Sequence, residues 1–287
     1  MKLLRYGPVG MEKPGILAAD DTIRDLSGLL DDIGPNTLSP AALDVLSALD
    51  VDRLPHVPGS PRLGPPVSAI RKFVAVGLNY HDHAQESNQP APGEPVVFAK
   101  WTSCICGAND NIVQPRGSTK LDWEAELGVV IGRQARGVSE SDALSHVAGY
   151  CVVNDVSERS YQLERDGRQW DKGKGFDTFG PIGPYLVTAD EVGDPQSLDI
   201  WLDVNDQRMQ AGNTTNMIFS CAYLVHYCSQ IMTLEPGDII TTGTPAGVGL
   251  GMKPPRFLKP GDVVEVGIAK LGTQRQHVVA WPGGLAA

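Results

Sequence analysis

The sequence predicts a mixed, mostly β (α+β) fold, with a small N-terminal part ahead of a larger β-rich part. From about residue 72 onward, short apolar segments alternate with glycine and proline, as in KFVAVGL, EPVVFAK, EAELGVVIG, GYCVVND, IWLDVN, DIITTG and VVEVGIA. The 32 glycines and 22 prolines fit strands that are joined by tight turns. Few helices interrupt these strands, notably the segments 156–165 and 215–230.

The N-terminal part has a different pattern. It contains the short strand-like pieces KLLRYG, PGILAAD and TIRDLSG, then a Leu/Ala-periodic helix around 41–49 and a Pro/Gly-rich stretch over 55–66 that is typical of a linker. No cluster of acids, bases or nucleophiles occurs in it. We therefore expect a small accessory domain over 1–66 and a second domain, which carries the chemistry, over 67–287.

Bulk properties exclude several classes of protein. The 287-residue chain has a net charge of −10 and no basic stretch, whereas nucleic-acid binding requires a Lys/Arg patch. No apolar run approaches the roughly 20 residues that cross a bilayer, and the first residues are a poor match to a signal peptide. We expect neither nucleic acid nor a membrane as a partner.

Five cysteines are an odd number, which does not suggest a disulfide framework and favours a reducing, cytoplasmic compartment. Cys104 and Cys106 could form a metal pair. Because no second Cys/His pair stands at zinc-finger spacing, two small loop residues are the better interpretation.

The segment DWEAELGVV carries the strongest chemical signal. Side chains alternate between the two faces of a strand, so Glu124 and Glu126 share one face while Trp123, Ala125 and Leu127 share the apolar face. Two like charges on one face repel each other unless a cation lies between them, and carboxylate oxygens suit Mg²⁺, Mn²⁺ or Ca²⁺. A solvated edge strand is the alternative.

A second acid follows the apolar segment GYCVVN. Asp155 ends this predicted strand, and Arg159 and Gln162 lie four and seven residues later, on one face of the predicted helix. This pattern is typical of a third metal ligand beside an anion-binding pair. Asp155 could equally cap the helix, as carboxylates often do.

The segment GLNYHDHAQE places His83 and Glu86 three residues apart on a predicted helix. A carboxylate in contact with an imidazole fixes its tautomer and raises its basicity, as in a general base that acts on water. A surface His–Glu pair without a role is the alternative. His81 competes for the role of base but has no comparable carboxylate on its helical face.

Two glycine-rich segments follow. KGKGFDT places Lys174 in what we expect to be a flexible loop, and TTGTPAGVG forms a loop whose glycines allow close approach to a ligand. The second is not a phosphate loop of the P-loop type, because the Gly-x4-Gly-Lys-Ser/Thr pattern is missing.

Taken together, these motifs resemble the fumarylacetoacetate hydrolase superfamily over roughly residues 72–270. The motifs VGLNYHDHAQE, EPVVFAKWTS, DWEAELGVVIG, GYCVVNDVSER, KGKGFDTFGPIGP, NTTNMIFS and GDIITTGTPAGVG occur in the order of the family. The resemblance implies a β-sandwich roll preceded by a small N-terminal domain, in a homodimer or higher homo-oligomer.

The resemblance also implies roles for individual residues. It implies Mg²⁺ or Mn²⁺ held by Glu124, Glu126 and Asp155, and a catalytic group of His83, Glu86 and Lys174. The substrate-binding residues that it implies are Arg159, Gln162, Thr178 and Thr244. The fourth acidic ligand of the eponymous enzyme has no clear counterpart here, and acylpyruvase-like members lack it too.

The activity implied is hydrolysis of the C3–C4 bond of a 2,4-dioxo acid to pyruvate and a hydroxy acid such as lactate. The opening MKLLRYGPVGMEKPGIL and the run RDGRQWDKGKGFDTFGPIGP are most similar to bacterial enzymes that act on 2,4-diketo-3-deoxy sugar acids, especially the L-rhamnonate derivative. Alternatives on the same scaffold are a ureidoglycolate lyase, a 2-oxo acid decarboxylase, an isomerase, or a binding protein that keeps the metal but not the catalysis.

Overall fold

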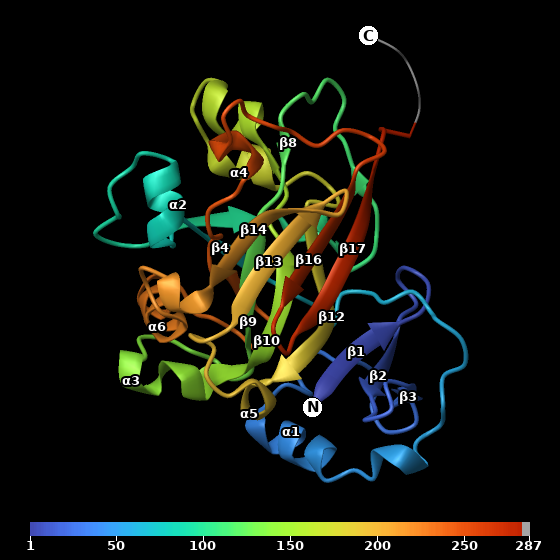
Figure 1. Ribbon diagram of the computed structural model, residues 1–287. Helices are drawn as coiled ribbons and strands as arrows, with labels where there is room; N and C mark the ends of the chain where they lie inside the picture. Colours follow the sequence, from blue (N-terminus) through green and yellow to red (C-terminus); the bar gives the residue numbers. More distant parts are fainter. Residues whose placement is uncertain (283–287) are drawn as a thin grey trace.

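The computed structural model describes residues 1–282, and its largest unit is a ten-stranded sheet (Figure 1). The strands of its main path run in the order β3-β2-β1-β12-β10-β9-β15-β4-β5, and β6 pairs with β12. Their bounds are β1 Lys2–Tyr6, β2 Lys13–Leu17, β3 Ile23–Asp25, β4 Phe73–Gly77, β5 Val96–Lys100, β6 Ile105–Gly107, β9 Ala125–Ile131, β10 Val147–Asn154, β12 Gly180–Thr188 and β15 Ile239–Thr241.

A five-stranded sheet packs against the large one, in the order β14-β13-β16-β17-β7. In Figure 1 its strands lie across β9, β10 and β12, with which they are in contact. A third pair is formed by β8 and β11. The bounds are β7 Ile112–Val113, β8 Leu121–Asp122, β11 Ser157–Glu158, β13 Asp199–Val204, β14 Gln207–Asn213, β16 Val263–Ile268 and β17 Gly272–Val279.

Burial follows from this arrangement. All residues of β9 and β10 are buried, because these central strands are covered on both faces. In β13, by contrast, buried residues alternate with more exposed ones, as in a sheet with one face toward solvent. The expected mostly β fold of two packed sheets is therefore confirmed.

The helices are short and lie around the sheets (Figure 1). None in the described part of the chain is long and apolar enough to cross a membrane. The α-helices are α1 Pro40–Ser47, α2 His81–Glu86, α3 Glu140–Ala143, α4 Trp170–Lys174, α5 Ala189–Val192 and α6 Cys221–Ile231. A π-helix spans Ser160–Glu164, and 3₁₀ helices span Val51–Arg53, Thr102–Cys104, Leu144–His146, Thr214–Asn216 and Gly249–Gly251.

The helix predicted over 156–165 is present only in its second half. Ser157 and Glu158 form β11, paired with Leu121 and Asp122, and a π-helix follows. The reason is a local hydrogen bond, in which the Glu158 carboxylate accepts from the Tyr161 backbone N–H at 2.9 Å. This bond ends the strand and begins the helical turn. The helix predicted over 215–230 begins only at Cys221, because the Ser220 hydroxyl caps it by accepting from Tyr223 N.

The N-terminal strands extend the large sheet. β1 pairs antiparallel with β12, with Leu3 opposite Leu186, and β2 and β3 follow outward. Arg62, near the end of the Pro/Gly-rich stretch, pairs with Asp110 of the larger part at 2.6 Å. The N-terminal residues are therefore continuous with the sheet that carries the central strands, and the domain boundary near residue 66 stays a prediction.

Candidate metal centre and active site

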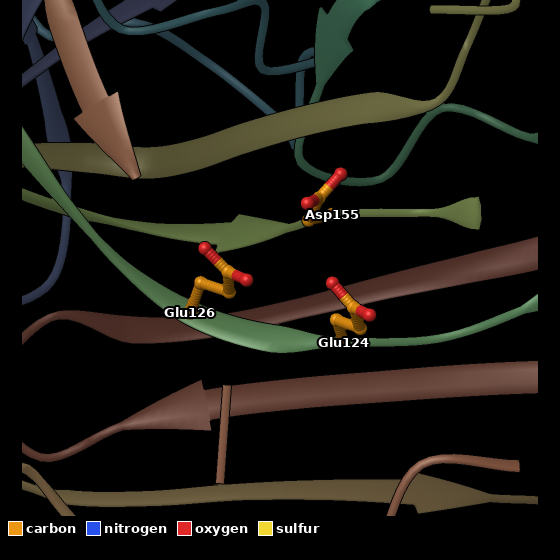
Figure 2. A group of neighbouring side chains, drawn as sticks. All are labelled: Glu124, Glu126 and Asp155. Atoms are coloured by element: carbon orange, nitrogen blue, oxygen red, sulfur yellow. The ribbon is translucent and has the colours of Figure 1, made fainter. Parts of the chain in front are cut away.

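Three carboxylates meet where β9 and β10 lie side by side. Glu124 precedes β9, Glu126 lies within it and Asp155 follows β10; the Asp155 N–H donates to the Glu124 carbonyl at 2.9 Å. One oxygen of each carboxylate lies within 4.8 Å of the other two, and all three residues are buried. Figure 2 shows Glu124 and Glu126 on the same side of their segment, with Asp155 on the neighbouring one. A solvated edge strand is excluded, because β9 lies between β10 and β15.

Glu124 is held by two cations. Its Oε2 lies 2.5 Å from the Lys174 ammonium and its Oε1 lies 2.7 Å from Arg159 Nη2. Burial alone would raise the pKa of Glu124, but Lys174 and Arg159 outweigh it and lower this pKa to about 2. The two cations therefore hold Glu124 in its ionised form.

Among residues 1–282, Glu126 has neutral hydrogen-bond donors only. Its Oε2 accepts from the Thr241 hydroxyl at 2.5 Å and from the Gly243 N–H at 2.9 Å. Burial, followed by the charges of Asp155 and Glu124, raises the pKa of Glu126 well above its ordinary value. A divalent cation between the three carboxylates would offset this repulsion, and their hard oxygen atoms suit Mg²⁺ or Mn²⁺. The residues present thus fit a divalent ion.

Asp155 binds two lysines rather than capping a helix. Its Oδ1 accepts from Lys100 at 2.5 Å and its Oδ2 from Lys174 at 2.8 Å. Lys100, the last residue of β5, is fully buried, and its ammonium also donates to the Lys174 carbonyl at 2.6 Å. Sequence reasoning missed Lys100; the only signal was a lysine at the end of an apolar strand.

Lys174 does not lie in a flexible loop, so that expectation was wrong. It is the last residue of α4 and is buried. Burial alone would lower the pKa of Lys174, but Asp155 and Glu124 raise it, so the side chain is an ammonium. Its contacts with two carboxylates make the lysine part of the acidic cluster.

Arg159 and Gln162 lie beside the cluster, in contact with each other. Arg159 Nη1 donates to Gln162 Oε1 at 2.9 Å, and Arg159 Nε donates to Asp122 Oδ2 at 2.8 Å. Asp122, a second residue that sequence reasoning missed, also accepts from the N–H groups of Gly249 and Leu250. The guanidinium is therefore fixed in place by a buried carboxylate.

His83 and Glu86 form a pair on α2. His83 Nδ1 lies 3.1 Å from Glu86 Oε2, and Glu86 Oε1 accepts from the Gly247 N–H at 2.9 Å. The carboxylate is thus held by the glycine-rich loop and in turn fixes the imidazole. His81 is exposed on the same helix and makes no such pair within the described part of the chain.

One cavity of about 440 Å³ joins these groups. The three carboxylates, Lys174, Arg159, Gln162, His83, Glu86 and Thr244 all line it. The Thr244 hydroxyl donates to the Ala125 carbonyl at 2.9 Å and accepts from Gln210 Nε2 at 2.8 Å. The structure brings together nine of the ten site residues that the sequence suggested.

Thr178 is the exception. It lines a separate cavity, next to Cys106 and Asp110. Its hydroxyl accepts from the Val113 N–H at 2.9 Å, and its backbone has a φ of 67°. The structure therefore does not place Thr178 with the other nine residues, and its role in substrate binding stays a prediction.

Comparisons with known proteins bear on the family of the chain. Residues 72–279 match the family model described as fumarylacetoacetate (FAA) hydrolase C-terminal. A Burkholderia lata protein, whose name proposes a hydrolase without stating a substrate, is 61% identical over 96% of this chain and 98% of its own length.

Solved structures are similar over nearly the whole chain. The fumarylacetoacetate hydrolase of Exiguobacterium antarcticum is 36% identical with a TM-score of 0.84, covering 98% of this chain and 100% of that one. Maleylpyruvate hydrolase from Sphingobium sp. SYK-6, in complex with manganese(II) and pyruvate, is 29% identical with a TM-score of 0.81, covering 98% and 99%. A 2-hydroxyhepta-2,4-diene-1,7-dioate isomerase from Mycobacterium marinum is 33% identical with a TM-score of 0.78, covering 99% and 100%. The chain belongs to the fumarylacetoacetate hydrolase family.

Proposed function

We propose that this protein is a Mg²⁺- or Mn²⁺-dependent hydrolase that cleaves the C3–C4 bond of a 2,4-dioxo acid. The observation that carries the proposal is the shared cavity, in which a buried group of three carboxylates and a His–Glu pair face the same space. The products are pyruvate and the acid that contains C4. For a 2,4-diketo-3-deoxy-L-rhamnonate the second product is lactate.

Glu124, Glu126 and Asp155 would hold the ion, which when bound would act as a Lewis acid toward the oxygens of the 2-oxo acid. Arg159, with Gln162 beside it, is placed to bind the carboxylate end of the substrate, since a guanidinium suits carboxylate geometry.

His83 is the group that we assign to water activation. Oriented by Glu86, its imidazole removes a proton from water, and the oxygen of that water adds to C4. The C3–C4 bond then breaks, its electron pair remains on C3 as the pyruvate enolate, and C3 receives a proton. Either protonated His83 or the Lys174 ammonium can supply that proton.

Other activities of the same scaffold make different products. Decarboxylation of a 2-oxo acid releases carbon dioxide, ureidoglycolate cleavage releases glyoxylate and urea, and isomerisation releases nothing. None of these reactions requires an activated water at C4, and the His83–Glu86 contact is the observation that favours hydrolysis. A protein that only binds metal and oxo acids would release no product.

The test is a panel of acylpyruvates and 2,4-diketo-3-deoxy sugar acids, assayed for pyruvate with Mg²⁺, with Mn²⁺ and with EDTA. We expect stoichiometric pyruvate and acid from at least one substrate, and loss of turnover in EDTA that either metal restores. Turnover that is indifferent to EDTA, or carbon dioxide in place of the second acid, would contradict the proposal.

A further inference from the structure

Five of the apolar side chains that line the cavity form a group that we call the apolar wall. They come from β5, the π-helix, α4 and the 3₁₀ segment that follows the glycine-rich loop: Phe98, Leu163, Trp170, Leu250 and Met252. Leu163 and Leu250 are each 37% exposed and so present apolar surface to the cavity. Nothing in the proposed chemistry uses these five residues.

The two aromatic side chains of the wall are held in place by packing. The rings of Phe98 and Trp170 meet edge to face with centroids 5.4 Å apart. The indole lies directly on the end of β4, because a Cβ atom on Gly77 would come within 2.3 Å of Trp170 Cζ3. The position of Trp170 therefore depends on a glycine at residue 77 and is not a chance surface conformation.

The residues of the apolar wall are adjacent to residues that line the acidic end of the cavity. Trp170 begins the helix that Lys174 ends, and Leu163 directly follows Gln162. The Leu250 N–H donates at 3.0 Å to the same Asp122 carboxylate that fixes Arg159. A substrate whose dioxo acid end lies at the acidic cluster would therefore extend its other end along this wall.

Polar side chains also line this cavity. Ser87, Gln89 and the exposed Lys253 line the same cavity, and in the described residues Lys253 forms no ion pair. A substrate that ends in a carboxylate would be drawn to Lys253, whereas an apolar end would cover the wall. The number of apolar side chains and the exposure of two leucines favour the second.

We infer, building on the proposed hydrolysis, that the apolar wall binds the substituent on C4 and selects substrates in which this substituent is apolar at its end. A hydroxyl group against the wall would lose its water without gaining a partner. The substrate class is thus 2,4-dioxo acids with an alkyl or aryl end. Among deoxy sugar acids, those that end in a methyl group are preferred over those that end in a hydroxymethyl group.

The experiment uses acylpyruvates with linear C4 substituents from methyl to pentyl. For the wild-type protein we expect kcat/KM to rise by about two- to fourfold with each methylene that the wall covers. In the double variant Leu163→Asn/Leu250→Asn this dependence on chain length should flatten. The matched control is Leu144→Asn, a leucine that is 39% exposed on a segment outside the cavity; it should keep the wild-type dependence.

The outcomes separate the two proposals. Pyruvate release that does not depend on chain length in the wild type, or an unchanged dependence in the double variant, overturns the role of the wall and leaves hydrolysis standing. A homologue with a terminal carboxylate that exceeds the alkyl series would assign the outer site to Lys253 and also overturn the inference. If no alkyl homologue yields pyruvate but a 2,4-diketo-3-deoxy sugar acid does, the inference about the wall fails and hydrolysis stands. If neither kind of substrate yields pyruvate, the proposed hydrolysis itself fails.

Discussion

The ammonium group of Lys100 lies 2.5 Å from Oδ1 of Asp155, and both side chains are buried. The same ammonium donates to the Lys174 carbonyl at the end of α4. One side chain from β5 thus holds a carboxylate of the acidic cluster and the helix that brings the second lysine to it. The other oxygen of Asp155, Oδ2, accepts from Lys174 and faces the acidic cluster.

Replacing Lys100 by methionine should therefore weaken both the fold and metal binding. Breaking a buried ion pair leaves a charge without its partner and costs about 3–5 kcal/mol of unfolding free energy. Loss of a group that orients a ligand typically lowers metal affinity by about 10–100-fold. Urea denaturation and Mn²⁺ titration calorimetry measure the two effects.

The control for this variant is Lys120→Met. Lys120 pairs with Glu164 at the surface, where both side chains are at least one-third exposed, and such pairs contribute about 0–1 kcal/mol. Equal losses in the two variants would show that Lys100 has no special role in holding Asp155.

Replacing His83 by alanine should lower kcat by about 10²–10⁴-fold, the range of general acid–base catalysis. Metal affinity should change little, because His83 contacts Glu86 and none of the three carboxylates by hydrogen bond. His81→Ala, an exposed histidine on the same helix, is the matched control and should keep wild-type turnover. Near-normal turnover in His83→Ala would mean that another group is the base.

Replacing Gly77 by alanine should displace Trp170, because the added Cβ would overlap the indole. Such overpacking costs about 1–3 kcal/mol, and the movement of α4 should change the tryptophan fluorescence and reduce activity. Gly28→Ala, at an exposed position with nothing within 4 Å of the added carbon, should change stability by less than about 0.5 kcal/mol. A Gly77→Ala protein with native fluorescence and stability would contradict the packing described here.

The buried thiols should be unreactive in the native protein. Burial raises the pKa of Cys104 to about 11 and the pKa of Cys151, Cys221 and Cys228 to about 12. Because the thiolate is the reactive form, these groups stay protonated and slow to react at pH 8. Titration with a disulfide reagent should detect five thiols after denaturation and at most one, Cys106, before it. Rapid reaction of several thiols in the native state would contradict this.

The sequence allowed the general fold to be predicted, because strand alternation and glycine-rich turns are local signals. It failed where side chains compete with the backbone. The segment after Asp155 has helical periodicity, but the Glu158 carboxylate hydrogen-bonds to Tyr161 N and divides it. Periodicity also could not reveal that β1 joins the large sheet beside β12, a pairing between residues far apart in the chain.

Residue spacing predicted the candidate site only where its residues are close together in the sequence. Glu124 and Glu126 are close in sequence, and their shared face follows from strand geometry. Lys100 and Asp122 were missed because each acts through a partner from a distant segment, Asp155 and Arg159 respectively. Thr178 lies apart from the other nine residues, at a turn position with positive φ that lines another cavity.

The central claim is that three buried carboxylates bind one divalent cation, and Mn²⁺ binding to protein treated with EDTA tests it most directly. The account predicts one Mn²⁺ per chain by calorimetry, with affinity largely lost in Glu124→Gln and in Glu126→Gln but kept in His83→Ala. Wild-type protein that binds no Mn²⁺, or glutamine variants that bind it as tightly as the wild type, would contradict the account.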